Sequence, residues 1–285
     1  MDNTDCTVIV NTCDAYEDVW EMFFCAFNEH WPECKYNIVL NTEKKLYHSS
    51  DPNIGTHNFH SPGKKDAWGL RLRKSLQQIN TPYVIMLFDD FILNGAANQV
   101  KVEECLDNLK RNANISVFYF TNIYGENCDN REFSGFDLVA SNADYRLNSA
   151  PAIWRRNHLL DYTGQYDNPW AWEVFGSYRT YATKHLFYCA KKDDEDIYPY
   201  NYSLGGAIYR GKWVPSVVIP LVEKYGLEID LEHRGLADES DRVSSKRSFL
   251  WKVNFIFLGF KMIKFRVFLF VFRVLKNKLS KLMLS

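Results

Sequence analysis

The chain has 285 residues, enough for one large domain or two small ones, and its 46% hydrophobic and 24% charged residues are ordinary for a globular protein. This composition excludes wholesale disorder and collagen-like repeats. The seven cysteines are an odd number without a CxxC pair, which indicates free thiols in a reducing compartment. No signal peptide is recognisable at the N-terminus, so we expect a cytoplasmic protein.

Strands and helices alternate along the first 120 residues. Short apolar, β-branched runs predict strands over 6–11, 35–40, 83–88 and 115–120. Apolar residues at helical spacing predict helices over 19–27, 67–79 and 102–109. Such alternation is typical of an α/β fold with a mostly parallel sheet flanked by helices.

The residues that follow the strands are the candidates for a binding site, because ligands of such sheets bind outside the carboxyl ends of the strands. These residues are 11–16, Thr42-Glu43 and Asp89-Asp90. The sequence has neither GxGxxG nor GxxxxGK[ST], which excludes an ordinary dinucleotide-binding domain and a P-loop protein.

Asp89 and Asp90 directly follow an apolar strand, where they repel each other and lose hydration. A cation or several hydrogen-bond donors would offset this cost, and Mg²⁺ and Mn²⁺ prefer carboxylate oxygens together with water and a diphosphate. The alternative is an ordinary acidic turn after a strand.

A strand, a polar turn, a helix with Trp68, Arg71 and Arg73, and a strand ending in Asp-Asp follow one another in this chain. This order resembles the nucleotide-sugar domain of GT-A glycosyltransferases, whose fourth strand ends in a D-x-D-like motif. The later segments 149–160, 168–177 and 211–213 look like those of a bacterial polysaccharide glycosyltransferase. The resemblance covers about residues 5–215. Because Asp-Asp replaces a strict D-x-D, it leaves open both a Mn²⁺ or Mg²⁺ cofactor and a metal-independent site.

The resemblance implies a GT-A-like domain over 1–245, with a nucleotide-sugar half over about 1–125 and an acceptor half over about 126–245. It also implies two groups of donor-binding residues. The group near the nucleoside is Asn11, Asp14, Tyr16 and Glu43, and the group near the diphosphate and the metal is Arg71, Asp89, Asp90 and Lys212. The alternatives are loop caps, core aromatics and solvated helix faces.

Glu173 lies between two indoles, Trp170 and Trp172, which would exclude water and raise the pKa of its carboxyl group. The resemblance implies that Glu173 is the base that removes the acceptor proton in inverting sugar transfer. The two tryptophans would then offer flat faces to the acceptor sugar. The alternative is a glutamate that caps a helix beside structural tryptophans.

The charge of the chain is divided unevenly. Residues 246–285 hold ten Lys or Arg and no acid, which leaves 24 basic against 35 acidic side chains in residues 1–245, a net charge of −11. Phe, Leu, Val and Trp lie between these cations, but no uncharged run is long enough to span a bilayer. We therefore expect one or two helices in the headgroup layer of an anionic membrane. The alternatives are a helix packed on the core and nucleic-acid contact, and the acidic body disfavours the latter.

Together these features favour an inverting glycosyltransferase that is peripheral on the cytoplasmic face of a bacterial membrane. It would move a sugar from a nucleotide-diphosphate donor to a polyprenyl-linked oligosaccharide in the biosynthesis of O-antigen or capsule. A nucleotidyltransferase is one alternative. The other is a non-catalytic, membrane-bound scaffold or sugar-binding subunit.

Overall fold

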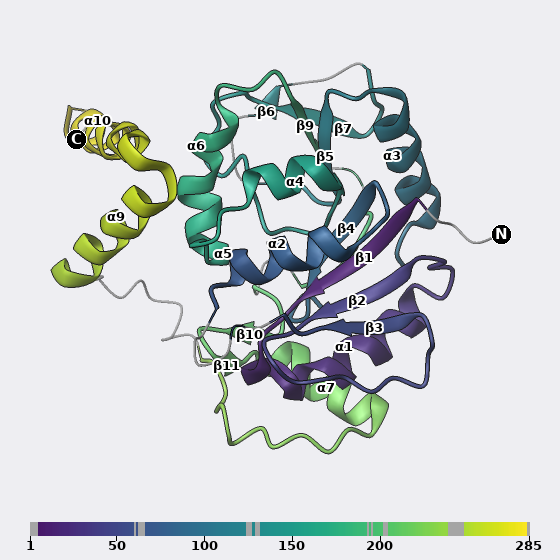
Figure 1. Cartoon of the computed structure of the whole chain (residues 1–285). Coiled ribbons are helices and arrows are strands. Elements are labelled where there is room, and N and C mark those ends of the chain that lie inside the picture. Colours follow the sequence, from purple (N-terminus) through teal and green to yellow (C-terminus); the bar gives the residue numbers. More distant parts are fainter. Residues whose placement is uncertain are drawn as a thin grey trace.

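A computed structural model of the chain describes residues 5–59, 61, 66–123, 127–128, 132–192, 194, 196–201, 205–238 and 248–283, with side chains as far as residue 276. Its centre is a nine-stranded sheet with the order β3-β2-β1-β4-β8-β5-β9-β7-β6 (Figure 1). The strands are β1 (Cys6–Asn11), β2 (Asn37–Asn41), β3 (Ile54–His57), β4 (Tyr83–Phe88), β5 (Ile115–Tyr119), β6 (Asn127–Cys128), β7 (Phe136–Val139), β8 (Ala152–Arg155) and β9 (Leu186–Ala190). Strands β7 and β8 are antiparallel to the other seven strands, which are parallel to one another.

Helices cover both faces of the sheet because its central strands are apolar on both sides. In β1, Val8 and Val10 face one core cluster and Ile9 faces the other. The first cluster includes side chains of α1 (Glu17–His30), α3 (Gln99–Arg111) and α7 (Pro215–Tyr225). The second includes side chains of α2 (Trp68–Gln78) and α4 (Arg156–Tyr162). The expected α/β class, a mostly parallel sheet flanked by helices, is confirmed.

The segment after β8 carries several short helical elements. They are α4, then α5 (Pro169–Ala171), the π-helix η2 (Trp172–Gly176) and α6 (Ser177–Thr180). Asn168 caps α5, because its side-chain oxygen accepts a hydrogen bond from the Ala171 amide at 2.8 Å. Glu173 thus lies in a widened helical turn rather than in a regular helix.

Two regions outside the sheet complete the body. The 3₁₀ turn η1 (Asp14–Tyr16) joins β1 to α1, and the strands β10 (Ile208–Tyr209) and β11 (Lys212–Trp213) form a small hairpin. The expected boundary near residue 125 falls within 124–126, outside the described residues, as does the boundary at 245–246 within 239–247. The strands before and after residue 125 nevertheless belong to one sheet.

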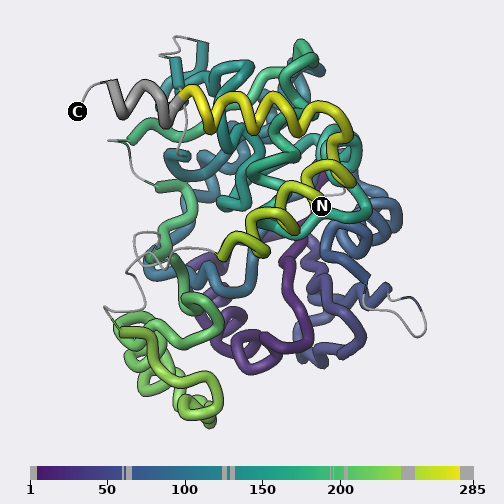
Figure 2. Tube along the Cα trace, turned by 90° about the vertical axis from the view of Figure 1, so that its left-hand side faces the viewer, coloured from purple at the N-terminus to yellow at the C-terminus, as the bar shows by residue number. Residues whose placement is uncertain are grey.

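The C-terminal segment forms α9 (Phe249–Ile263), the 3₁₀ turn η4 (Lys264–Arg266) and α10 (Val267–Met283). Figure 2 shows the two long helices lying across one side of the body. They contact it through a third apolar cluster that contains Phe175 and Tyr178 of the body and Ile263 and Val267 of the C-terminal segment. No helix in the described part of the chain is both long and apolar enough to cross a bilayer.

Candidate functional site

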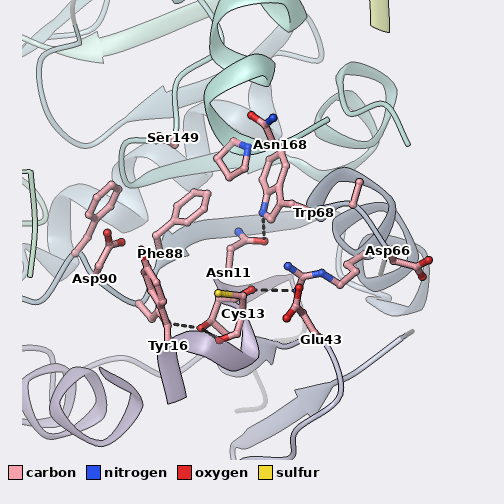
Figure 3. A pocket seen from close by; sticks show the side chains of 16 residues that line it. Asn11, Cys13, Tyr16, Glu43, Asp66, Trp68, Phe88, Asp90, Ser149 and Asn168 are labelled. Atoms are coloured by element: carbon pink, nitrogen blue, oxygen red, sulfur yellow. Dashed lines mark hydrogen bonds between the residues drawn. The ribbon is translucent and has the colours of Figure 1, made fainter. Parts of the chain in front are cut away.

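A cavity of about 610 Å³ lies at the carboxyl ends of β1, β2 and β4. In Figure 3, Tyr16, Phe88 and Asp90 lie on one side of it, and Glu43, Asp66 and Trp68 lie on the other. The parallel order of the three strands explains the convergence, because it brings the ends of distant segments to one edge. Of the predicted donor-binding residues, Asn11, Tyr16, Glu43, Arg71, Asp89 and Asp90 line this cavity.

Asp89 and Asp90 face different environments. Asp89 is 2% exposed, and its carboxylate accepts a hydrogen bond from the Thr12 hydroxyl, which in turn accepts one from the Trp20 indole at 2.7 Å. Burial, together with the charge of Asp90, raises the pKa of Asp89 well above its usual range. Burial raises the pKa of Asp90 to about 7. The pair therefore needs a positive partner to ionise fully at neutral pH.

The end of β4 is held in place by a close backbone contact. The Ala207 amide donates a hydrogen bond to the Asp90 carbonyl at 2.7 Å. Gly206 has a φ of 88°, and a Cβ at that position would lie 2.5 Å from the same carbonyl oxygen. Glycine is thus required here both for the backbone conformation and for the approach to Asp90.

Arg71 brings a buried positive charge to the cavity. It is 3% exposed, and its Nη1 donates to the carbonyls of Thr12 at 3.1 Å and Asn41 at 3.2 Å. Its Nε has no hydrogen-bond partner. Burial lowers the pKa of Arg71, and the negative charge of Glu43 counteracts part of this shift. Because Arg71 lines the cavity, its buried positive charge favours an anionic ligand there.

Tyr16 forms an aromatic wall of the cavity and is supported from outside. The Arg234 guanidinium lies over its ring, 4.8 Å from the centroid, and is fixed by hydrogen bonds to Asp18 and to the Ala15 carbonyl. Burial, reinforced by the negative charge of Asp90, raises the pKa of Tyr16 to about 12. The tyrosine is therefore neutral and rigidly held, as a stacking surface for a flat ligand requires.

Three of the predicted donor residues have other roles in the structure. Asn11 lines the cavity, but its side-chain oxygen accepts a hydrogen bond from the Trp68 indole (Figure 3). The same oxygen accepts from Asn41, and the side-chain nitrogen donates to the Leu87 carbonyl, so the amide is occupied within the protein. Asp14 does not line the cavity, and its carboxylate accepts from the amides of residues 43–45 at 3.0–3.2 Å, which lowers its pKa. Lys212 lies in β11 and does not line the cavity either. For Asp14, the alternative of a loop cap matches the structure.

Glu173 lines a second, neighbouring cavity of about 340 Å³. Both cavities have Phe91 and Ser149 in their walls, so the two spaces adjoin at these residues. Oε1 of Glu173 accepts hydrogen bonds from the Ser149 amide at 2.8 Å and the Ser149 hydroxyl at 2.5 Å. Burial raises the pKa of Glu173, and these two hydrogen bonds counteract part of that rise.

The structure contradicts the prediction that Trp172 binds the acceptor sugar, whereas the prediction for Trp170 stays a prediction. Trp172 is fully buried in the core, and its indole donates to the Tyr162 carbonyl at 3.1 Å, so it has no face to offer. Trp170 stacks on Phe255 of α9 with ring centroids 4.2 Å apart and is still 41% exposed. Sequence reasoning could not separate these roles, because neighbouring residues of a helical turn point in different directions.

Sequence reasoning also missed several residues around the site. Ser149 and Phe91 join the two cavities, and Asp66 and Asn168 line the first, as does Cys13 of the expected range 11–16. Ser149 opens the segment 149–160 and Asn168 opens the segment 168–177, both of which the sequence analysis singled out without giving these two residues a role. No sequence pattern pointed to Arg234, because its contact with Tyr16 joins segments that lie more than 200 residues apart in the chain.

The two aspartates can hold a divalent cation only with help from a ligand. In the part of the chain that the structure describes, no three His, Cys, Asp or Glu side chains are grouped to bind a metal ion. Asp90 lines the cavity, whereas Asp89 is engaged with Thr12. Diphosphate oxygens and water would therefore have to supply most ligands of a Mn²⁺ or Mg²⁺ ion.

The sequence matches no protein-family profile and no curated protein. Its fold is similar to that of solved structures. The match with the structure of S. aureus TarS 1-349 covers 92% of this chain and 82% of the TarS chain, at 12% identity and a TM-score of 0.46. The match with a longer structure of S. aureus TarS covers 81% of this chain and 41% of the TarS chain, at 13% identity and a TM-score of 0.43. The match with a cytidylyltransferase from Leptospira borgpetersenii covers 78% of this chain and 95% of the cytidylyltransferase chain, at 10% identity and a TM-score of 0.39. Likenesses at this level concern the fold alone.

Proposed function

We propose that the protein is an inverting glycosyltransferase of GT-A type that uses a nucleotide-diphosphate sugar as donor. The observation that carries this proposal is the pair of adjoining cavities. One has an aromatic wall, a buried cation and a carboxylate of raised pKa, and the other has the partly buried Glu173. A transfer reaction needs such a pair, because the donor and the acceptor must meet at one point.

The first cavity supplies the chemistry that recognises the donor. Tyr16 offers a ring against which a nucleobase can stack, and the buried guanidinium of Arg71 offers the charge that a diphosphate needs. Asp90 would hold a Mn²⁺ or Mg²⁺ ion bound to the diphosphate, and this ion would offset the charge of the leaving group. Its positive charge would also lower the pKa of Asp90 and keep the carboxylate ionised.

Glu173 is the proposed base. Its carboxylate would take the proton of the acceptor hydroxyl while that oxygen forms a bond to the anomeric carbon. The bond between that carbon and the phosphate oxygen breaks, and its electron pair leaves with the nucleoside diphosphate. A raised pKa makes Glu173 a stronger base, and Ser149 fixes the direction of its carboxylate.

The proposed acceptor is a polyprenyl-linked oligosaccharide at the cytoplasmic face of a bacterial membrane, as in the assembly of O-antigen or capsule. What supports this part is the basic and apolar C-terminal segment, which suits a protein whose acceptor is held at a membrane.

Release of nucleoside diphosphate and sugar transfer test the proposal. The purified protein is incubated with UDP-, GDP- and dTDP-sugars, with and without Mn²⁺, and with a mixture of lipid-linked acceptors. We expect turnover with one donor class and its loss in Glu173→Gln, which keeps the shape of the side chain but cannot accept the proton. Release of pyrophosphate from a nucleoside triphosphate would instead identify a nucleotidyltransferase. Absence of nucleotide binding and of turnover would contradict the proposal.

A further inference from the structure

The helices α9 and α10 are apolar on two sides. One side is packed on the body, and the other carries large apolar side chains that face outward. On α9, Phe249, Val253, Phe257 and Phe260 recur at helical spacing and are 37–82% exposed. On η4 and α10, Phe265, Phe268, Phe272 and Leu275 do the same and are 54–75% exposed. We call these eight residues the outer face.

The packed side fixes this outer face relative to the body. Gly259 lies against the Phe175 ring, Arg266 donates to the Tyr178 carbonyl at 3.1 Å, and Arg273 pairs with Asp144 at 2.7 Å. The two helices therefore do not need the outer face to hold their place. A soluble monomer rarely leaves so many aromatic side chains together in water, which indicates that a partner covers them.

The charge around the outer face identifies that partner. The same helices carry the exposed lysines Lys252, Lys261 and Lys264, of which Lys261 lies 4.8 Å from the Phe257 ring centroid, and residues 246–285 contain no acid. Anionic lipid headgroups would complement these cations, while the rings enter the acyl boundary. A second copy of the chain is a poorer fit, because a two-fold contact sets the same face against itself and brings cation against cation.

We infer that the outer face of α9 and α10 is a docking surface for an anionic lipid bilayer. It would hold the molecule with the side seen in Figure 2 against the membrane plane. The packed side of α9 reaches Trp170 and Phe175, which lie on either side of Glu173 in the chain. Contact with the bilayer would thus fix the distance between the membrane and the segment that carries Glu173. Lipid binding itself does not depend on the proposed sugar transfer.

Vesicle flotation with the full-length protein tests this inference. One set of vesicles contains phosphatidylglycerol in phosphatidylcholine, and the other contains phosphatidylcholine alone. We expect binding to the anionic vesicles that weakens as salt is added. The double variant Phe265→Ser/Phe268→Ser should lower the partition coefficient about tenfold or more, because two rings no longer enter the bilayer. The control is Val100→Ser on α3, an apolar side chain that is 75% exposed elsewhere.

A second pair of variants tests the charges separately. Lys261→Glu/Lys264→Glu should again lower binding to anionic vesicles about tenfold or more, whereas Lys44→Glu/Lys184→Glu, which reverses two exposed lysines of the body, should leave most of it. Failure of the wild type to float with anionic vesicles would overturn the inference. So would a stable dimer, seen by light scattering, that Phe265→Ser/Phe268→Ser dissolves. Because no donor is present, the outcome is independent of whether the protein transfers sugar.

Discussion

Replacing Asp90 by asparagine is expected to stabilise the ligand-free protein at pH 8 while destroying its proposed activity. The carboxyl group of Asp90 is neutral in the folded state up to about pH 7, although an unfolded aspartate ionises near pH 3.8. Above pH 3.8 the folded state therefore binds a proton that the unfolded state has lost. The free energy of unfolding falls as the pH rises through this window and levels off above pH 7. An asparagine at position 90 does not titrate, and it also removes the charge that helps to raise the pKa of Asp89, so the variant keeps only the dependence that the burial of Asp89 causes.

The size of the effect follows from the shift. A rise from 3.8 to about 7, at 1.36 kcal/mol for each pKa unit, corresponds to about 4 kcal/mol. About 3 kcal/mol of this is expected between pH 5 and pH 8, and the rest lies below pH 5. The hydrogen bond from Ala207 to the backbone carbonyl of residue 90 is retained in the variant, so the side-chain charge is the main change.

Urea unfolding of both proteins at pH 5 and at pH 8 measures this difference. Asp90→Asn should lose less stability than the wild type between the two pH values, by up to about 3 kcal/mol. The control is Asp107→Asn, at an exposed aspartate of α3, which should follow the wild type. If Asp90→Asn and the wild type showed the same dependence on pH, Asp90 would be ionised in the free protein, and our account of the cavity would be wrong.

Four further outcomes are expected. Glu173→Gln should lower kcat by roughly 10²–10⁴ while leaving the KM for the donor nearly unchanged, and wild-type kcat should rise with pH as the carboxyl ionises. Arg71→Met should weaken binding of a nucleoside diphosphate on the order of 50-fold in calorimetry, because one charge-assisted contact to phosphate is lost. In the presence of a nucleoside diphosphate, added Mn²⁺ should raise the Tm of the wild type further and should not do so in Asp90→Asn. Gly259→Ala should destabilise the protein by about 1–3 kcal/mol in urea unfolding, because the new Cβ would lie 2.8 Å from the Phe175 ring.

The strands that are buried on both faces could be predicted from the sequence alone. The run 83–88 forms β4 and 6–11 forms β1, because an uninterrupted apolar segment has few alternatives to the centre of a sheet. It did not reveal β3, where only Ile54 is buried and the neighbouring residues are typical of a loop. The parallel order then explains why the residues that follow β1, β2 and β4, among them Tyr16, Glu43 and Asp90, lie at one edge of the sheet.

The direction of individual side chains could not be predicted. Asp14 and Asp90 both follow strands, but one accepts three backbone amides and the other lines the cavity. Trp170 and Trp172 are two residues apart, yet one packs on α9 and the other is buried in the core. These differences depend on contacts with distant segments, which local sequence patterns do not encode.

Because Glu173 lies in the π-helical turn at residues 172–176, the direction of its side chain depends on the number of residues in that turn. Such a turn arises from one residue inserted into an α-helix. Deletion of Val174 would restore regular winding and rotate the residues before it by about 100° relative to those after it. Glu173 would turn away from Ser149, or else Phe175 would leave its place under α9. A single-codon deletion would thus uncouple the carboxylate from the C-terminal helices while every other side chain of the two cavities is retained.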